Sequence, residues 1–371
     1  MSDPGRHGGL AVAMLSPCFW PEVRRGGERL VRDLADGLIS RGHRPRLITS
    51  HPGLPSRSVE DGLPITRHWR PPEGRLRRRQ YVEYLSHAPW SYLSLRFGRD
   101  DLAHAVYPTD AVAAARWSAR SGRPTVFTYL GIPTRAGLTY KRYQLEVMLR
   151  AVEGSTAVVA LSRAASEAFR WWLGVDARVI HPGVDLRVFR PGPRADAPTV
   201  FCGAALDEPR KRVGLLVSAF EHVRRERPAA RLVLSRPRDP ASARLVATGP
   251  AVELRDVDDR AALARAYAEA WVSVLPSYNE AFGLVLAEAM ACGTPVVGSN
   301  RDGIREVVDR EAVGRLFDGD DERSLAATVL EALELSRDPA TAEACRRRAE
   351  ELSTDRSVEA YERLYRELLE R

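Results

Sequence analysis

Short continuous apolar runs alternate along the first half of the chain with apolar residues at helical spacing. The continuous runs are typical of strands buried on both faces, and they occupy residues 10–16, 46–49, 124–129, 156–162 and 177–180. The helical spacings occupy residues 28–40, 107–119, 140–152 and 163–173. Residues 51–99 are less regular. An alternation of strand and helix predicts a mostly parallel sheet.

Residues 181–198 (HPGVDLRVFRPGPRADAP) interrupt this alternation, because they are rich in proline and glycine and show little periodicity. The alternation then resumes, with strands predicted at 199–205, 231–235, 252–256 and 271–275 and helices at 215–225, 260–270, 325–334, 340–352 and 357–369. A chain of 371 residues is also too long for one ordinary domain. We therefore predict an α/β protein with domains at 1–185 and 186–355.

The most informative stretch is 276–306 (PSYNEAFGLVLAEAMACGTPVVGSNRDGIRE), which has the pattern of strand end, loop, helix, turn and strand. The helix is expected to begin near Gly283 or Leu284, and its first amides are unpaired and partly positive, which suits a diphosphate. Glu288 lies one turn into the helix, where a carboxylate can accept two hydrogen bonds from a ribose diol. Glu280 lies in the loop, within reach of a sugar beyond the diphosphate. The alternative is that Glu280 is an ordinary N-terminal helix acid and Glu288 a surface residue.

Two further features have the chemistry of an anion site. Gly26-Gly27 stands at the start of the first predicted helix, where amides can approach a phosphate, although a plain turn uses the same residues. Lysine occurs only at Lys141 and Lys211, either by chance or because a compact ammonium is needed there. Lys211 or Arg210 could supply the positive charge that a diphosphate requires.

A net charge of +7 and a pI of about 9.5 favour anionic partners without choosing among them. Residues 67–79 (RHWRPPEGRLRRR) carry six arginines, and aromatic residues follow up to residue 97. This pattern is compatible with peripheral contact of 67–97 with an anionic membrane or a lipid-linked acceptor, with single-stranded nucleic acid, or with a solvated arginine face beside a packed helix. We expect no nucleic acid partner.

The four cysteines, Cys18, Cys202, Cys292 and Cys345, are widely spaced and suit buried free thiols in a reducing cytoplasm. They predict no metal site. No apolar run is long enough to span a membrane, and no signal peptide opens the chain. We expect a cytoplasmic protein, with the inner membrane face as its one candidate for peripheral contact.

The run PSYNEAFGLVLAEAMACGTPVVGSNRDGIREVV resembles the signature of the retaining glycosyltransferases of the GT-B fold, which include phosphatidylinositol mannosyltransferases. Glu280 and Glu288 match the E-x7-E pair of that family. Other matches follow in the family's order: Gly26-Gly27, Gly42-His43, HPGVDLRVFRP at the linker and DEPRK ending at Lys211. The resemblance covers nearly the whole chain.

The resemblance implies two Rossmann-like domains that face a cleft, with the last helix (356–371) crossing back to the acceptor-binding first domain. The second domain would bind a UDP- or GDP-sugar, with no further cofactor and no metal. Transfer to the hydroxyl of a small molecule, a saccharide or a lipid-linked acceptor would retain the anomeric configuration by front-face displacement. The implied catalytic residues are Glu280, Lys211 and Tyr129. The implied donor-binding residues are Gly26, Gly27, Arg210, Lys211, Asn279, Glu280, Ala281, Phe282, Gly283, Leu284 and Glu288.

Two departures from the family pattern bear on this expectation. Tyr129 stands where many members carry a histidine that touches the donor sugar, and Ala204-Ala205 stands where many carry an arginine. The missing diphosphate contact would then come from Arg210, Arg212 or Arg25. These departures keep open a catalytically impaired nucleotide-sugar-binding partner protein, and an epimerase or pseudo-glycosyltransferase of the same fold.

Overall fold

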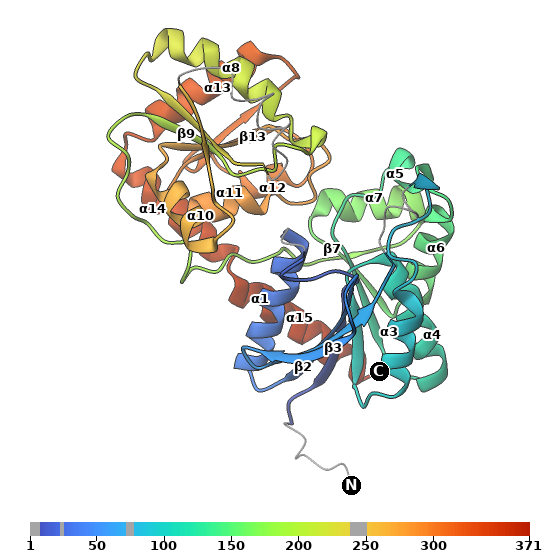
Figure 1. Cartoon of the computed structure of the whole chain (residues 1–371). Helices are drawn as coiled ribbons and strands as arrows, with labels where there is room; N and C mark the ends of the chain where they lie inside the picture. Colours follow the sequence, from blue (N-terminus) through green and yellow to red (C-terminus); the bar gives the residue numbers. More distant parts are fainter. Residues whose placement is uncertain (1–7, 23–25, 72–77, 238–250) are drawn as a thin grey trace. The chain divides into compact units, whose positions relative to one another are not determined.

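The computed structural model describes residues 8–22, 26–71, 78–237 and 251–371 (Figure 1). The chain divides into two compact units, of which the first comprises Met1–His181 and Thr354–Arg371 and the second Pro182–Ser353. In the structure the boundaries between the two units fall after residues 181 and 353. The sequence predicted these boundaries after residues 185 and 355. The proline-rich linker begins the second unit.

The first unit is built on one sheet with the strand order β3-β4-β2-β1-β5-β6-β7-β8. All neighbouring strands pair in parallel except β3 and β4. The strands are β1 (Ala11–Leu15), β2 (Arg44–His51), β3 (Ser56–Glu60), β4 (Leu63–Trp69), β5 (Leu102–Ala105), β6 (Thr125–Tyr129), β7 (Ala157–Ala160) and β8 (Arg178–Val179). The described helices are α1 (Gly26–Ser40), α3 (Ala88–Arg96), α4 (Pro108–Ser121), α5 (Arg135–Thr139), α6 (Gln144–Gly154), α7 (Arg163–Leu173) and α15 (Thr354–Leu369).

Two hydrophobic clusters cover the two faces of this sheet, one beneath α1 and α15 and the other beneath α3, α4, α6 and α7. The last helix, α15, packs against α1, and a Cβ at Gly37 would lie 2.4 Å from the Val358 side chain. Tyr365 and Tyr361 of α15 reach the sheet, where the Tyr365 hydroxyl lies 2.6 Å from Nδ1 of the buried His104. The C-terminal helix is therefore part of the core of the first unit, although it follows the second unit in sequence.

The hairpin of β3 and β4 was not predicted from the sequence. Asp61 and Gly62 connect the two strands, and both have positive φ (48° and 83°), as a type I′ turn requires. The Asp-Gly pair was the available signal. The apolar pattern hid the hairpin because Ser56–Glu60 lies at the sheet edge and its side chains are mostly exposed.

The second unit contains a parallel sheet with the order β11-β10-β9-β12-β13-β14. Its strands are β9 (Thr199–Cys202), β10 (Arg231–Ser235), β11 (Val252–Arg255), β12 (Val272–Leu275), β13 (Val296–Ser299) and β14 (Gly314–Phe317). Its described helices are the short 3₁₀ helix η1 (Pro209–Lys211), α8 (Val213–Glu226), α10 (Arg260–Glu269), α11 (Leu284–Ala291), α12 (Ile304–Val307), α13 (Glu322–Leu335) and α14 (Pro339–Glu351). In Figure 1, α8 and α13 cover one face of the sheet, and α10, α11 and α14 cover the other.

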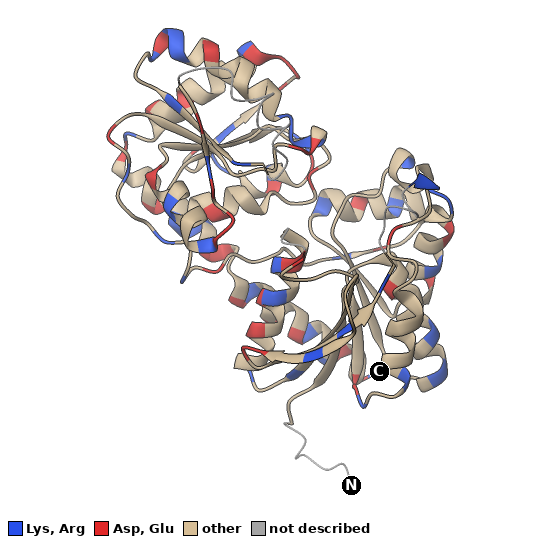
Figure 2. Ribbon diagram, in the orientation of Figure 1, with Lys and Arg blue, Asp and Glu red and all other residues tan. Residues whose placement is uncertain are grey.

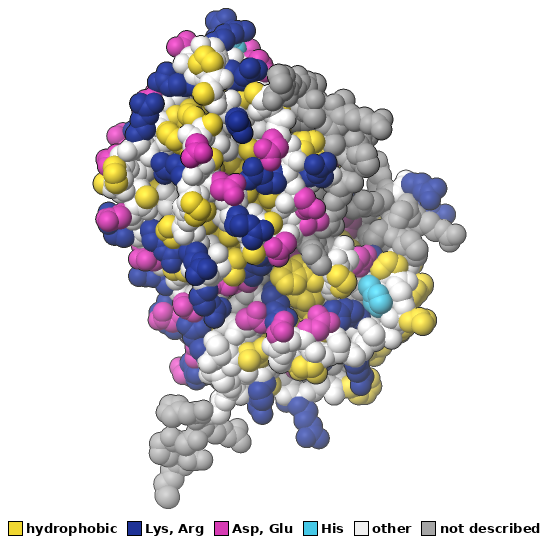
Figure 3. Space-filling model, turned by 60° about the vertical axis from the view of Figure 1, so that its left-hand side comes forward, with side chains coloured by type: hydrophobic (Ala, Val, Ile, Leu, Met, Phe, Trp, Pro, Cys, Tyr) yellow, Lys and Arg dark blue, Asp and Glu magenta, His cyan; other side chains and the backbone are white. Residues whose placement is uncertain are grey.

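Charged residues of both signs are distributed over the helices and loops of both units (Figure 2). On the face drawn in Figure 3, basic and acidic side chains are interspersed over the second unit. A helix long and apolar enough to cross a membrane is absent from the described part of the chain. The four cysteines all lie in the described part of the chain, where they are buried thiols that form no disulfide.

Candidate functional site

The stretch from Pro276 to Leu284 connects the buried strand β12 to helix α11. Asn279 has φ 53° and Gly283, the N-cap of α11, has φ 101°, so two residues with positive φ turn the chain sharply before the helix begins. Gly303 supports this turn from the loop after β13, because its amide donates to the Glu280 carbonyl at 3.0 Å. A Cβ at Gly303 would lie 2.3 Å from the carbonyl oxygen of Ala281, so a side chain there would displace the turn.

The Glu280 carboxylate is held by two basic residues of the loop after β9. Its Oε2 atom lies 2.5 Å from Lys211 Nζ and 3.0 Å from Arg210 Nη1, and it also accepts a 3.2 Å hydrogen bond from Ser277 Oγ. The side chains of Glu280 and Lys211 are only 13% and 11% exposed. In such a setting the ion pairs are screened less than on the surface. The structure thus brings together three residues that the sequence predicted for one site.

The electrostatics of Glu280 follow from this pairing. Burial alone raises the pKa of the Glu280 carboxyl, but the charge of Lys211, followed by that of Arg210, lowers it more, so the net pKa lies below its usual range. Glu280 is therefore ionised at neutral pH and is no proton donor. Arg210 also pairs with Glu208 at 2.9 Å, so two cations and two carboxylates lie together just before α11.

Glu288 has different surroundings, although it belongs to the same segment. It is 2% exposed and lies on α11, where its Oε2 atom accepts a 3.4 Å hydrogen bond from the Tyr267 hydroxyl. Gly203, just after β9, lies close by, since a Cβ there would be 2.7 Å from the same hydroxyl. Glu288 is therefore buried rather than a surface residue. Tyr267 and Gly203 were missed from the sequence, where nothing marks them as neighbours of Glu288.

The side chain of Arg212 connects several loops of this region. These contacts were not predicted from the sequence. Its backbone has φ 49°, and its Nε atom donates to the Pro276 carbonyl at 2.6 Å. Its Nη2 atom lies 3.3 Å from Ser299 Oγ, and its Nη1 atom contacts the Asp320 carboxylate. Arg212 therefore ties the loop that carries Lys211 to the loop that carries Glu280, and it does not itself contact Glu280 through any described hydrogen bond.

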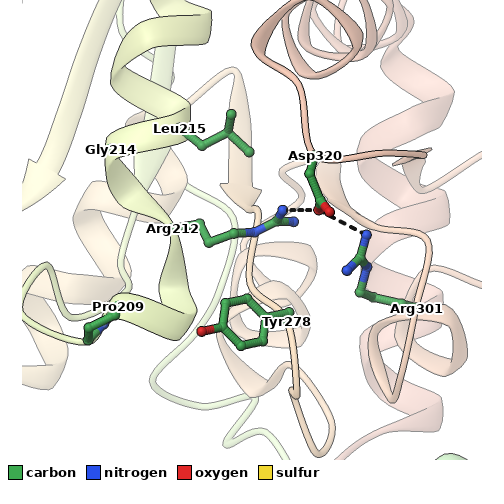
Figure 4. Close-up of a pocket in the computed structure, with 7 residues that line it drawn as sticks. All are labelled: Pro209, Arg212, Gly214, Leu215, Tyr278, Arg301 and Asp320. Atoms are coloured by element: carbon green, nitrogen blue, oxygen red, sulfur yellow. Dashed lines mark hydrogen bonds and ion pairs between the residues drawn. The ribbon is translucent and has the colours of Figure 1, made fainter.

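A pocket of about 580 Å³ adjoins these loops (Figure 4). Asp320 lies between Arg212 and Arg301 in Figure 4, and the Arg301 Nη2 atom is 3.1 Å from its Oδ1 atom. Tyr278 and Leu215 complete two sides of the pocket. Neither Glu280 nor Glu288 lines it, so we assign the candidate site to the Glu280–Lys211 pair and the N-terminus of α11.

The predicted residues of the first unit lie near one another within that unit. Gly26 and Gly27 begin α1, and a Cβ at Gly27 would lie 2.6 Å from the Leu130 side chain, directly after β6. Tyr129 ends β6, and its ring packs edge-on against Phe169 with centroids 5.8 Å apart. Burial raises the pKa of the Tyr129 phenol, so it is protonated at neutral pH and is able to donate a hydrogen bond.

The remaining sequence predictions concern the alanine pair after β9, Arg25, the basic run 67–79 and a metal site. Ala204 is buried and Ala205 exposed, while Arg25 and residues 72–77 of the basic run lie outside the described residues. Within that run, Arg67 and Arg70 are turned into ion pairs with Glu60 (2.8 Å) and Glu22 (2.5 Å) and are only 11% and 4% exposed. These two arginines form no solvated basic face. A group of three or more His, Cys, Asp or Glu side chains that could hold a metal does not occur among the described residues.

Comparison with protein families gives matches in both units. Residues 24–188 match the family described as Glycosyltransferase Family 4, and residues 197–335 match Glycosyl transferases group 1. Phosphatidyl-myo-inositol mannosyltransferase from Mycobacterium tuberculosis is 29% identical over 346 residues, which cover 87% of this chain and 86% of that protein. D-inositol 3-phosphate glycosyltransferase from Mycolicibacterium smegmatis is 35% identical over 184 residues, 44% of this chain and 40% of the relative. The match to such glycosyltransferases thus spans less than half of their length.

Solved structures show the same fold over nearly the whole chain. Sucrose-phosphate synthase from Thermosynechococcus elongatus superimposes with a TM-score of 0.81 at 23% identity, covering 96% of this chain and 98% of that one. HepE from Anabaena, solved in complex with UDP and glucose, gives a TM-score of 0.75 at 19% identity, covering 96% of this chain and 99% of its own. With two parallel α/β units and glycosyltransferase matches along both of them, the chain belongs to the group 1 glycosyltransferases of the GT-B fold.

Proposed function

We propose that this protein transfers a sugar from a nucleotide-sugar, with UDP or GDP as the nucleotide, to a hydroxyl group of an acceptor, with retention of the anomeric configuration. The observation that carries the proposal is the arrangement around α11. Lys211 and Arg210 converge beside a helix N-terminus, which is where a diphosphate would bind, while Glu288 lies buried within the helix. HepE from Anabaena was solved in complex with UDP and glucose, and this supports a nucleotide-sugar as the donor.

We assign each residue to one part of the donor. Glu288 is assigned to the ribose hydroxyls and Glu280 to the hydroxyls of the transferred sugar. Lys211, Arg210 and the amides of Phe282, Gly283 and Leu284 bind the diphosphate, with Asn279 and Ala281 shaping the turn that presents them. Because Glu280 already occupies both cations in the free protein, the incoming diphosphate has to share or replace its ion pairs.

In the transfer step, the bond between the sugar's anomeric carbon and the diphosphate oxygen breaks, and a bond from that carbon to the acceptor oxygen forms on the same face. The proton of the acceptor hydroxyl passes to the departing diphosphate. Lys211 and Arg210 stabilise the negative charge that develops on the leaving group, which is electrostatic catalysis by preorganised charges. We infer that these cations and the helix amides make a metal unnecessary. Tyr129, as a protonated phenol, would donate a hydrogen bond in the place of the family histidine.

Three measurements test this proposal. Thermal shifts with UDP, GDP and ADP identify the nucleotide, because a ligand that binds only the folded state raises the melting temperature. Release of nucleoside diphosphate is then followed with matching donors and a panel of acceptors, with and without EDTA, and NMR of the product gives its anomeric configuration. Tight donor binding without release from any donor would support an impaired partner protein instead. Inversion, or loss of activity with EDTA, would refute the proposed mechanism.

The acceptor is expected to bind the first unit. Two relatives are named for inositol-containing acceptors, one of them a lipid. Helix α3 supports a peripheral membrane contact of this unit, since Trp90, Leu93 and Phe97 follow one another at helical spacing and are 39%, 41% and 80% exposed. We propose this stripe, rather than Arg67 and Arg70, as the part of 67–97 that would meet a membrane.

A further inference from the structure

The first unit contains a cavity of about 430 Å³ at the carboxyl ends of β1 and β2. Parallel sheets bind their ligands at this edge. The residues around the cavity come from the loop after β1 and from β2, β3 and β4, and those used below are Trp20, Glu22, Thr49, Ser56, Glu60 and Arg67. The strand register brings Thr49, Ser56 and Arg67 together, because Thr49 and Ser56 both pair with Arg67 across neighbouring strands. Glu60 reaches Arg67 through its side chain.

The loop that closes this cavity is held in place by the sheet. Arg67 donates to the Trp20 carbonyl at 3.1 Å and pairs with Glu60 at 2.8 Å. Ser50 Oγ donates to the Pro17 carbonyl at 2.7 Å, and Glu22 is fixed by its ion pair with Arg70. Trp20 is therefore presented by an anchored loop, which is the preorganisation that a binding site needs.

Trp20 offers a flat apolar surface. Its indole stacks on the buried ring of Phe19, with ring centroids 5.7 Å apart and an interplanar angle of 22°. Phe19 belongs to the hydrophobic core beneath α1, so the orientation of the aromatic pair is fixed from behind. Aromatic walls combined with a few placed polar groups are the usual composition of a small-molecule site.

Two polar atoms of this wall have no hydrogen-bond partner among the described residues, namely Trp20 Nε1 and Thr49 Oγ1. Both are buried, and a buried polar group that stays unpaired costs stability. One is a donor and the other is both donor and acceptor, which matches the hydroxyl groups of a ligand.

The charges of the cavity indicate what kind of ligand it accepts. Its two described carboxylates, Glu22 and Glu60, are each neutralised by an arginine, and Arg67 is at the same time occupied by Glu60 and Trp20. An anionic ligand such as a phosphate would have to break one of these ion pairs. A neutral ligand leaves both in place.

We propose that this cavity binds the acceptor as an uncharged, hydroxyl-rich ring, a saccharide or a cyclitol, whose apolar face lies on the Trp20 indole and whose hydroxyls meet Thr49 and the indole NH. The assignment of the ring as acceptor rests on the proposed glycosyl transfer. The binding itself does not, so it can be measured without a donor.

Saturation-transfer NMR with the full-length protein provides this measurement. The neutral probes are myo-inositol and methyl α-D-glucopyranoside, and the charged probe is myo-inositol phosphate. We expect a neutral ring to bind wild type more tightly than the charged probe does. Trp20→Ala should weaken its binding at least about tenfold, which corresponds to about 1.4 kcal/mol, and Thr49→Val should weaken it about threefold. Trp171→Ala removes an indole that is 80% exposed on α7, outside the cavity, and should leave binding unchanged.

Three results would overturn the proposal: tighter binding of the phosphate ester, no binding of either neutral ring, or equal binding by Trp20→Ala and wild type. Trp20→Phe keeps an aromatic ring without the indole NH, so it covers the case in which Trp20→Ala does not fold. Affinity for nucleoside diphosphate should be the same in all four variants. A wild-type protein that binds the ring but releases no nucleoside diphosphate would contradict the transfer reaction and leave the cavity assignment standing.

Discussion

Replacing Glu280 by glutamine should stop sugar transfer and at the same time tighten the binding of free nucleoside diphosphate. In the free protein the Glu280 carboxylate occupies Lys211 at 2.5 Å and Arg210 at 3.0 Å, the two cations that the proposed diphosphate site requires. Glutamine keeps the size of the side chain and removes its charge. The diphosphate then meets Lys211 without its competing carboxylate, while Arg210 keeps its 2.9 Å ion pair with Glu208.

The magnitude follows from the burial of the pair. At an effective dielectric constant of about 20, a carboxylate about 6 Å from a phosphate charge is repelled by about 3 kcal/mol. Part of this repulsion is offset because the carboxylate also keeps Lys211 in position, so we expect a net gain of about 1–1.5 kcal/mol, or about tenfold in the dissociation constant. Lys211, being 9% exposed, loses its partner in the variant, so the free protein should also melt earlier and regain more of its melting temperature when the ligand binds.

Isothermal titration calorimetry with the nucleoside diphosphate that binds wild type measures this gain, and product formation measures the loss of transfer. The difference between the two proteins should disappear in acid. Since ion pairing lowers the folded-state pKa of Glu280, the pair contributes stability above the ordinary glutamate pKa of about 4.3, and this contribution is lost as the pH falls through the lower, folded-state value. Equal or weaker binding by Glu280→Gln at neutral pH would refute the competition between Glu280 and the diphosphate.

Substitutions at four other positions test further parts of the proposal. Glu288→Gln should weaken nucleotide affinity about tenfold, because the charge is lost and one of the two oxygens that accept from the ribose hydroxyls becomes an amide group that only donates; calorimetry that finds no change would remove Glu288 from the nucleotide site. Lys211→Ala should lower both donor affinity and kcat, and an unchanged kcat would exclude it from the reacting end of the donor. Arg212→Gly suits the backbone at φ 49° and removes only the side-chain contacts, so kcat should fall several-fold with a nearly unchanged melting temperature; full activity of Arg212→Gly would show that the tie to Pro276 is dispensable. Phe97→Ser should reduce co-sedimentation with phosphatidylglycerol vesicles, and identical sedimentation of both proteins would argue against α3 as a membrane contact.

The sequence predicted the regular part of the fold because its strands and helices have strong local patterns. The helix predicted over 163–173 is α7 at Arg163–Leu173, and the Ser162 hydroxyl caps it by accepting from the Ala165 amide. Strand β10 occupies the predicted residues 231–235. Such elements are determined by neighbours in sequence, so their periodicity and capping residues are sufficient to find them.

The contacts of Arg212 could not be predicted in this way. Its partners Pro276, Ser299 and Asp320 lie 64, 87 and 108 residues away along the chain, on loops that meet only because β9, β12, β13 and β14 are neighbours in the sheet. In the sequence it is one arginine among many in a charged loop. Tyr267 is comparable, since its hydroxyl reaches Glu288 from a different helix.

The different surroundings of Glu280 and Glu288 agree with our proposal that they bind the two ends of one nucleotide-sugar. Glu280 precedes the helix and faces two cations, so its charge is fixed and it can exchange partners with an incoming anion. Glu288 lies in the helix, where it is buried and accepts a hydrogen bond from the Tyr267 hydroxyl. A site built for acid and base catalysis would need one carboxyl with a raised pKa, and the pKa of Glu280 moves in the opposite direction. Glu280 is therefore disfavoured as the group that takes the acceptor proton, which agrees with our proposal that the departing diphosphate receives it.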